Sequence, residues 1–253
     1  MFLKSTEVDL FITPFGAGRT TFVAHGGWVG SGELWLPVFD RLSAQWRTVT
    51  YDHRGTGATV TRGAITFESL VQDLFRVLDA LAIDRCILAG ESSGALVVLE
   101  AALRQPGRFT GLLLVDGRSE SSNTAGAARF IEGCKTDFER TMDAFVRACV
   151  IEPDAEAELE WARKIVMRSD GPAAVQLMES MWSARVADRL EQIVQPTLLI
   201  HGRKDMITPV LASEEIARRI PNAKLVVLED AGHVPVMTRP SEVSAAVLEF
   251  FGG

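Results

Sequence analysis

Short runs of apolar residues alternate with longer stretches of helical spacing along most of this chain. Six runs are rich in β-branched and other apolar residues and end in a turn residue, which is typical of strands. They lie at 20–27, 46–55, 85–92, 111–117, 196–202 and 224–233, and residues 6–13 predict a weaker strand. Because strands that alternate with helices form mostly parallel sheets, the pattern predicts the α/β class.

Three helices are predicted between these strands. Apolar side chains share one helical face in 34–42 and again in 67–81, so these helices should pack on the sheet. Residues 95–103 are apolar on nearly every side, which predicts a helix buried near the centre of the fold.

The strand pattern stops between residues 118 and 190. Helical spacing replaces it at 125–133, 137–151, 155–168 and 172–186, and the next strand begins only at 196. We therefore expect a core formed by 1–117 and 191–253, with residues 118–190 inserted as four helices between two strands of one sheet.

Charge and composition exclude several classes of function. The 253 residues carry a net charge of −7 with no run of Lys or Arg, so no nucleic-acid partner is expected. The N-terminus lacks a sustained apolar run, which predicts neither a signal peptide nor a membrane span. Cys86, Cys134 and Cys149 fall in apolar or helical patterns and predict core thiols in a reducing, cytoplasmic compartment.

Ligands of parallel sheets bind beyond the carboxyl ends of the strands, so polar residues at those ends are candidates for function. The candidates are His25, Asp52, His53, Ser92, Ser93, Asp116, Asp205 and His233.

Residues Gly90-Glu91-Ser92-Ser93-Gly94 fit the pattern G-x-S-x-G between a predicted strand and a predicted helix. In that setting the glycines permit a tight turn that exposes the central side chain, as in a nucleophile elbow. The pattern predicts Ser92 as the nucleophile. A serine that only caps the helix would fit either Ser92 or Ser93.

A serine hydroxyl needs a base to take its proton and an acid to orient that base. His233 follows the last predicted strand, and Asp205 follows the strand before it. The order Ser92, Asp205, His233 is the one expected for an elbow of this kind. Asp116, which ends the strand at 111–117, is the alternative acid.

The chain resembles the α/β-hydrolase family through HGG at 25–27, YDHRGTG at 51–57, GESSG at 90–94, HGRKD at 201–205 and AGHVP at 231–235. The resemblance implies a mostly parallel central sheet, a four-helix cap inserted after the sixth strand and a Ser–His–Asp triad. It also implies an oxyanion hole formed by the backbone N–H groups of Gly27 and Ser93. We expect Trp28, which is adjacent, to line the acyl pocket.

We expect the other polar residues near the strand ends to support the structure and not to take part in catalysis. Asp52 and Arg54 are expected to hold their loop through hydrogen bonds and charge. His25 and His201 are expected to be packed and satisfied, and His53 to be partly exposed and without a role.

The elbow and the cap narrow the substrate class. Haloalkane dehalogenases and epoxide hydrolases resemble this chain in fold but carry Asp at the elbow, so Ser92 argues against both. The predicted cap is rich in Met and aromatic residues, and Met178, Met181 and Trp182 are predicted to face the substrate. No Arg or Lys cluster marks a site for an anionic group.

We therefore expect a serine hydrolase that cleaves a small to medium, rather apolar ester or lactone, without a metal or other cofactor, as a monomer or homodimer. Hydrolysis of a C–C bond and perhydrolysis use the same triad and remain alternatives. A ligand receptor of the same fold with little turnover is the alternative from another class.

Overall fold

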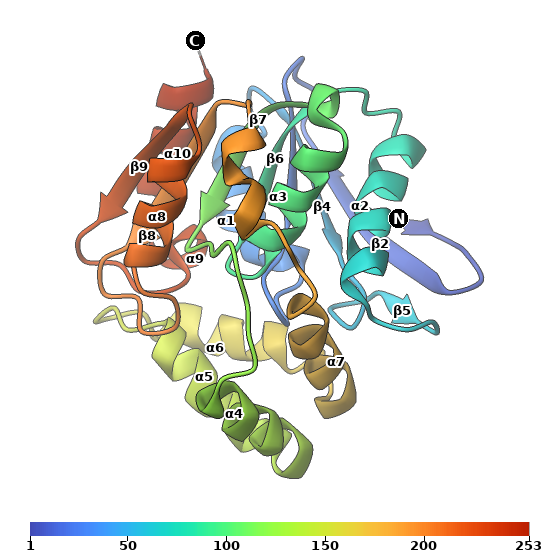
Figure 1. Ribbon diagram of the computed structural model, residues 1–253, viewed down its shortest axis with the longest axis vertical. Helices are drawn as coiled ribbons and strands as arrows, with labels where there is room; N and C mark the ends of the chain where they lie inside the picture. Colours follow the sequence, from blue (N-terminus) through green and yellow to red (C-terminus); the bar gives the residue numbers. More distant parts are fainter. Residues whose placement is uncertain (253) are drawn as a thin grey trace.

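The computed structural model describes residues 1–252 as a twisted sheet flanked by helices (Figure 1). Within these residues the sheet has nine strands in the order β1-β2-β4-β3-β6-β7-β8-β9, with β5 paired to β2. The strands are β1 Phe2–Leu3, β2 Val8–Phe15, β3 Thr21–His25, β4 Arg47–Asp52, β5 Val60–Thr61, β6 Cys86–Glu91, β7 Phe109–Val115, β8 Thr197–Gly202 and β9 Ala223–Leu228.

The sheet is mostly parallel, as the sequence pattern predicts. Strands β3, β4, β6, β7, β8 and β9 pair in parallel, whereas β1, β2 and β5 pair antiparallel. The two-residue strands β1 and β5 are too short to show an alternating pattern and were not expected. The helical segment at 118–190 consequently follows the seventh strand, β7, and not a sixth.

Helices cover both faces of the sheet (Figure 1). Helices α2 and α3 contact each other on one face, and α1 and α10 contact each other on the other face. The helices are α1 Leu36–Leu42, α2 Phe67–Ala80, α3 Gly94–Arg104, α4 Ala125–Thr136, α5 Phe138–Cys149, α6 Glu156–Val166, α7 Gly171–Met181, α8 Leu211–Arg219, α9 Pro235–Thr238 and α10 Pro240–Phe251. Residues 94–102 of α3 are all buried, in agreement with its apolar sequence.

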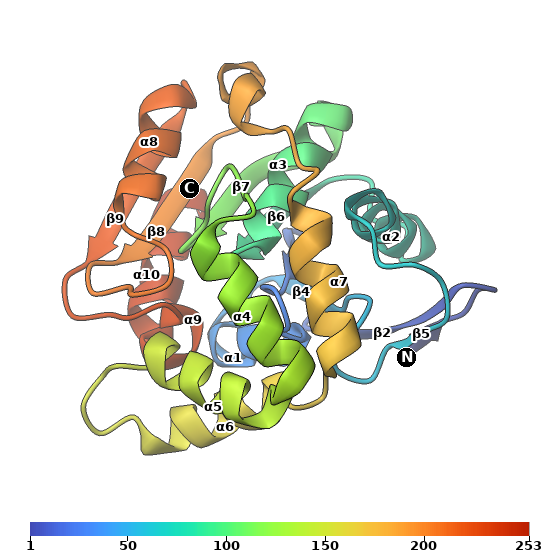
Figure 2. The same ribbon diagram turned by 60° about the horizontal axis from the view of Figure 1, so that its bottom comes forward.

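Helices α4 to α7 come between β7 and β8 in the chain and lie together beyond one end of the sheet (Figure 2). Polar residues begin three of them: Thr124, Asp137 and Asp170 accept backbone N–H groups at the starts of α4, α5 and α7. Helix α7 ends at Met181, five residues earlier than its apolar spacing predicts, because residues 182–184 form turns.

The strand order reverses at β3. The chain passes from β3 to β4 on one side and later returns to β6 on the other side of β3. At such a switch point the loops leaving the two neighbouring strands diverge and open a crevice at their carboxyl ends. His25 of β3 pairs in register with Gly90 of β6, so the loops at 26–30 and 91–93 flank this crevice.

Within residues 1–252, no helix has both the length and the apolar character that a membrane crossing requires.

Candidate active site

Ser92 lies in a sharp turn between β6 and α3. Its φ of 51° is in the left-handed region, which is strained for a residue with a side chain. A Cβ on Gly90 would lie 2.7 Å from the Gly94 carbonyl oxygen, and a Cβ on Gly94 would lie 2.5 Å from the Gly26 carbonyl oxygen. Both elbow positions therefore require glycine, because backbone passes too close for any side chain.

A chain of two hydrogen bonds links Ser92 to an acid. His233 Nε2 lies 2.9 Å from Ser92 Oγ, and His233 Nδ1 lies 2.7 Å from Asp205 Oδ2. Ser92 is 6% exposed and His233 is 1% exposed, so these hydrogen bonds are shielded from bulk water. These three residues come from three separate loops, which the carboxyl ends of β6, β8 and β9 bring together.

The loop after β8 holds Asp205 in place. Its Oδ1 accepts hydrogen bonds from the backbone N–H groups of Ile207, at 2.7 Å, and Thr208, at 2.9 Å. Burial opposes the charge of Asp205, but hydrogen bonds from His201 and His233 outweigh it and lower the pKa of the carboxyl. Burial is the main cause of a lowered pKa at His233 itself, so the imidazole is neutral at pH 7.

Asp116, the alternative acid, does not hydrogen-bond His233. Its Oδ1 accepts the Gly202 N–H at 2.9 Å, and its Oδ2 is buried without a partner among the described residues. Burial, followed by the charge of Asp205, raises the pKa of Asp116 well above its ordinary value. This environment disfavours a charge on Asp116, and its contact with the Gly202 N–H suits a structural acceptor and not the orientation of a cationic imidazole.

Two backbone amides face the crevice beside Ser92. No acceptor in residues 1–252 is hydrogen-bonded to the Ser93 N–H, which lies at the start of α3. The Gly27 N–H is directed at the carboxyl of Glu91, and a Cβ on Gly27 would collide with Oε2 of that carboxyl. The oxyanion role of Gly27 and Ser93 stays a prediction, and a glutamate side chain lies against Gly27.

His53 is 1% exposed, which corrects the expectation of a partly exposed side chain without a role. Its Nε2 lies 2.8 Å from the Gly27 carbonyl oxygen, and its ring stacks on His25 with centroids 4.8 Å apart. The spacing of a DHRG turn does not reveal this contact, because the loop after β3 covers His53 only in the folded chain. His53 therefore helps to orient Gly27.

Asp52 and Arg54 hold the neighbouring loop, as expected. Asp52 accepts the N–H groups of Gly32, at 2.9 Å, and Ala58, at 2.7 Å. Arg54 is buried and pairs with buried Asp73 at 2.6 Å.

A small cavity of about 40 Å³ opens beside Ser92 and His233. Apolar side chains from both the core and the α4–α7 segment dominate its wall, and one carboxyl, that of Glu91, faces it. The wall is formed by Gly27, Trp28, Val29, Gly30, Leu34, Glu91, Ser92, Phe145, Cys149, Ala162, Val166, His233 and Val234. Trp28 packs edge to face on Phe145 with centroids 5.4 Å apart.

Met178, Met181 and Trp182, which the sequence predicts to face the substrate, are not among the residues that line this cavity. Met181 is buried, and Met178 and Trp182 are partly buried and pack against the hydrophobic core. The α4–α7 segment instead contributes side chains from α5 and α6. Helical spacing identified an apolar face on each helix, but it did not show which neighbour each face meets.

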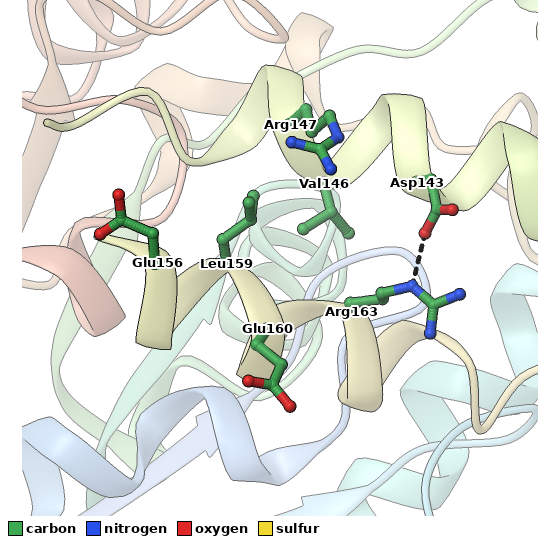
Figure 3. A pocket seen from close by; sticks show the side chains of 7 residues that line it. All are labelled: Asp143, Val146, Arg147, Glu156, Leu159, Glu160 and Arg163. Atoms are coloured by element: carbon green, nitrogen blue, oxygen red, sulfur yellow. Dashed lines mark hydrogen bonds and ion pairs between the residues drawn. The ribbon is translucent and has the colours of Figure 1, made fainter. Parts of the chain in front are cut away.

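A second hollow, of about 240 Å³, lies between α5 and α6 (Figure 3). None of its lining residues belongs to the Ser92 cavity. Three of its charged side chains are paired: Arg163 with Asp143 at 2.6 Å, and Glu160 with Lys164 at 2.7 Å. The hollow is therefore a surface groove crossed by an ion pair between α5 and α6. Among residues 1–252, its lining includes no Ser, His or Cys.

In the part of the chain that the structure describes, one group has the spacing of metal ligands, namely Asp116, Asp205 and His233. The hydrogen bond between His233 Nδ1 and Asp205 already uses two of the ligand atoms. We interpret the group as the acid side of the serine site and not as a metal centre. The three cysteines are buried and unpaired, as expected of core thiols.

The mostly parallel sheet and the serine elbow at its switch point define the class of α/β-hydrolase folds. The chain belongs to the alpha/beta hydrolase family, whose sequence profile matches residues 22–246.

Relatives of known name cover nearly the whole chain. RutD from Caulobacter sp. strain K31, provisionally named a carbamate hydrolase, is 27% identical over 93% of this chain and 91% of its own length. A pimeloyl-[acyl-carrier protein] methyl ester esterase from Nitrosomonas europaea is 29% identical over 92% of this chain and 96% of its own length.

Solved structures share the fold over the full length. A hydrolase from Pseudomonas aeruginosa PA01 superposes with a TM-score of 0.91 and 26% identity, covering 100% of this chain and 98% of that one. The enol-lactonase from Burkholderia xenovorans LB400 superposes with a TM-score of 0.92 at 21% identity and covers all of both chains.

Proposed function

We propose that this α/β hydrolase is a serine hydrolase that cleaves a carboxylic ester or lactone. The observation that carries the proposal is the continuous hydrogen-bonded chain from Ser92 Oγ through His233 to Asp205. A neutral, buried imidazole next to a hydroxyl at an elbow is the arrangement that makes serine nucleophilic at neutral pH.

In the first half of the reaction, His233 Nε2 takes the Ser92 proton while Oγ attacks the carbonyl carbon. The carbonyl electron pair moves onto oxygen, and the N–H groups of Gly27 and Ser93 stabilise the oxyanion. When the pair returns, the alkoxide leaves and takes the proton from His233, so Ser92 carries the acyl group.

In the second half, His233 takes a proton from water, and the hydroxide formed attacks the acyl carbon. The intermediate collapses to the carboxylic acid and restores the Ser92 hydroxyl. Throughout, the Asp205 carboxylate accepts a hydrogen bond from the Nδ1–H of His233, which keeps Nε2 free to act as the base and stabilises the imidazolium.

The cavity supports a neutral, apolar acyl group. Its wall is mostly hydrocarbon, and Trp28 and Phe145 provide an aromatic corner against which such a group can pack. An acyl group larger than the cavity of about 40 Å³ must displace these side chains. We therefore assign Trp28, together with Phe145, to substrate binding.

We also propose that residues 118–190 act as a cap that closes the site. Phe145 and Cys149 of α5 and Ala162 and Val166 of α6 line the cavity opposite Ser92. Opening of this segment would admit substrate, and its closure would exclude water.

A carbamate is the second candidate substrate, because RutD relatives align over nearly the whole chain at 25–29% identity. The same attack by Ser92 on a carbamate carbonyl would form a carbamoyl-enzyme. The relatives named as methyl ester esterases support an ester substrate, and they align over about the same share of this chain as the RutD relatives do.

The test is labelling with a fluorescent fluorophosphonate, followed by a panel of short-chain esters, lactones, carbamates and C–C diketones, with and without peroxide. We expect the wild type to be labelled and to turn over members of the panel, and Ser92→Ala to do neither. If the variant is labelled like the wild type, or if the wild type binds panel compounds without turnover, the serine hydrolase proposal fails.

A further inference from the structure

Glu91 ends β6 and directly precedes Ser92. Its side chain is almost fully buried, with 2% of the residue exposed, yet it lines the cavity beside Ser92. The position is the variable one in G-x-S-x-G, so the motif itself requires no carboxyl here. Burial of an ionisable group such as Glu91 costs free energy, and the Ser92, His233 and Asp205 triad does not require a carboxyl at this position.

The carboxyl of Glu91 lies between the base and an oxyanion donor. Oε1 is 3.7 Å from His233 Nε2, the same atom that bonds Ser92 Oγ. Oε2 presses against Gly27, where it takes the space that a Cβ would fill, and the Gly27 N–H is directed at the carboxyl. No side chain among residues 1–252 donates a hydrogen bond to this carboxyl.

Charged neighbours act on Glu91 from several elements. Burial first, and then the charge of Asp205 in the loop after β8, raise the pKa of Glu91 to about 8. Arg118, which follows β7, and the Gly27 N–H act in the opposite direction. His233 faces it from the loop after β9, and Cys149 and Asp116 carry raised pKa values to which the charge of Glu91 contributes.

We propose that Glu91 is a further functional residue of this site, and that the reaction requires its carboxyl to be neutral. The inference rests on the proposed serine hydrolase function. A Glu91 carboxylate against Gly27 places a negative charge where the oxyanion must develop. The neutral acid carries no such charge and offers an O–H donor to the oxyanion.

The consequence is a specific loss of rate at alkaline pH. The neutral form predominates below pH 8 and falls about tenfold per pH unit above it, since each unit above a pKa reduces the protonated fraction about tenfold. Burial lowers the pKa of His233, and this base stays neutral over the same range, so its titration produces no alkaline loss.

The experiment measures the rate of fluorophosphonate labelling of Ser92 between pH 6 and 10. In this reaction Ser92 Oγ bonds to phosphorus, fluoride leaves, and the serine proton passes to His233. The phosphoryl oxygen takes the oxyanion position. The quantity compared is the ratio of the rate at pH 9 to the rate at pH 7 within each variant, after subtraction of the rate of Ser92→Ala.

For the wild type we expect this ratio to be about 0.1, as the tenfold loss requires. For Glu91→Gln, which is neutral at every pH, we expect a ratio near one. Glu91→Leu is also neutral and similar in size. It replaces Glu91→Gln in the measurement if the glutamine variant does not fold, with the same expected ratio near one. Cys149→Ala removes a titratable thiol from the same cavity and should keep the wild-type ratio.

A wild-type ratio near one, or the same alkaline loss in the wild type and in Glu91→Gln, would overturn the Glu91 proposal and leave the serine hydrolase intact. A purely structural role for Glu91 predicts the second result, because it would change the rate equally at all pH values. If the wild type is not labelled at any pH, the proposed function itself fails.

Discussion

The carboxylate of Glu152 accepts a hydrogen bond of 3.0 Å from the backbone N–H of Gly232, the residue before His233. The same oxygen, Oε1, accepts the Thr238 hydroxyl at 2.6 Å. Glu152 follows α5, and the Cys149 carbonyl of α5 accepts the His233 N–H at 2.9 Å. The α4–α7 segment therefore holds the loop that carries the proposed base.

Glu152→Ala should loosen the His233 loop. We expect kcat to fall about tenfold with a smaller change in KM, because a small displacement of the base affects the chemical step. The free energy of unfolding should fall by about 1–3 kcal/mol, since the Gly232 N–H and Thr238 hydroxyl lose their buried acceptor. Steady-state kinetics and urea denaturation measure the two effects.

Glu152→Gln is the matched variant, because its amide oxygen can still accept from Gly232 and should restore most of the kcat. Equal loss of kcat in the alanine and glutamine variants would contradict this role for the carboxyl oxygen.

Ser92→Ala and Ser93→Ala should behave very differently. The first removes the proposed nucleophile, so we expect hydrolysis to fall to background, a loss of at least about 1,000-fold. The second leaves the Ser93 N–H in place, and its hydroxyl has no hydrogen-bond partner among residues 1–252, so the loss should stay below about tenfold. Turnover of the best panel ester measures both, and equal losses would mean that the elbow has been misinterpreted.

Asp205→Asn and Asp116→Asn separate the two candidate acids. The Asp205 variant cannot stabilise the imidazolium and favours the wrong tautomer, so we expect kcat to fall by about 1,000-fold or more. The Asp116 carboxyl does not bond His233, and its Oδ1 accepts the Gly202 N–H, a role that an amide oxygen also fills, so kcat should change by less than about fivefold. The opposite ranking of the two variants would make Asp116 the acid.

The acid limb of the pH profile should reflect His233. Burial lowers the pKa of His233 below its ordinary value of 6.5, and the reaction needs the neutral imidazole. The ratio kcat/KM should therefore still exceed half of its maximum at pH 6.5 and fall as the pH drops through the lowered pKa. A midpoint above 6.5 for the acid limb, measured with a substrate that does not ionise, would contradict this environment for His233.

The local parts of the molecule could be predicted from the sequence, because their causes are local. Ser92 was identified by glycines two residues away on each side, and the structure shows that backbone lies too close for side chains at both positions. The buried strands and α3 followed from continuous apolar runs, which only a doubly covered layer can accommodate. The short strands β1 and β5 lacked enough residues to produce a pattern.

The cavity wall could not be predicted in the same way. Apolar faces were visible on the helices of 118–190, but α5 and α6, and not α7, turned out to line the cavity. The sequence predicts a partly exposed His53, but the side chain is buried against Gly27. The sequence pattern does not show this burial, because the loop that covers His53 is distant in sequence. Periodicity shows that a side chain will be buried, but it does not show against what.

The sequence by itself determined the fold class, the elbow and the identity of its central serine, since spacing within a few residues produces each of them. Only the tertiary structure decided that Asp205 and not Asp116 bonds His233, and that the carboxyl of Glu91 lies between His233 and Gly27. Those relationships depend on how loops from different strands converge at the switch point. The distances and charges in that crevice arise from packing across the whole sheet.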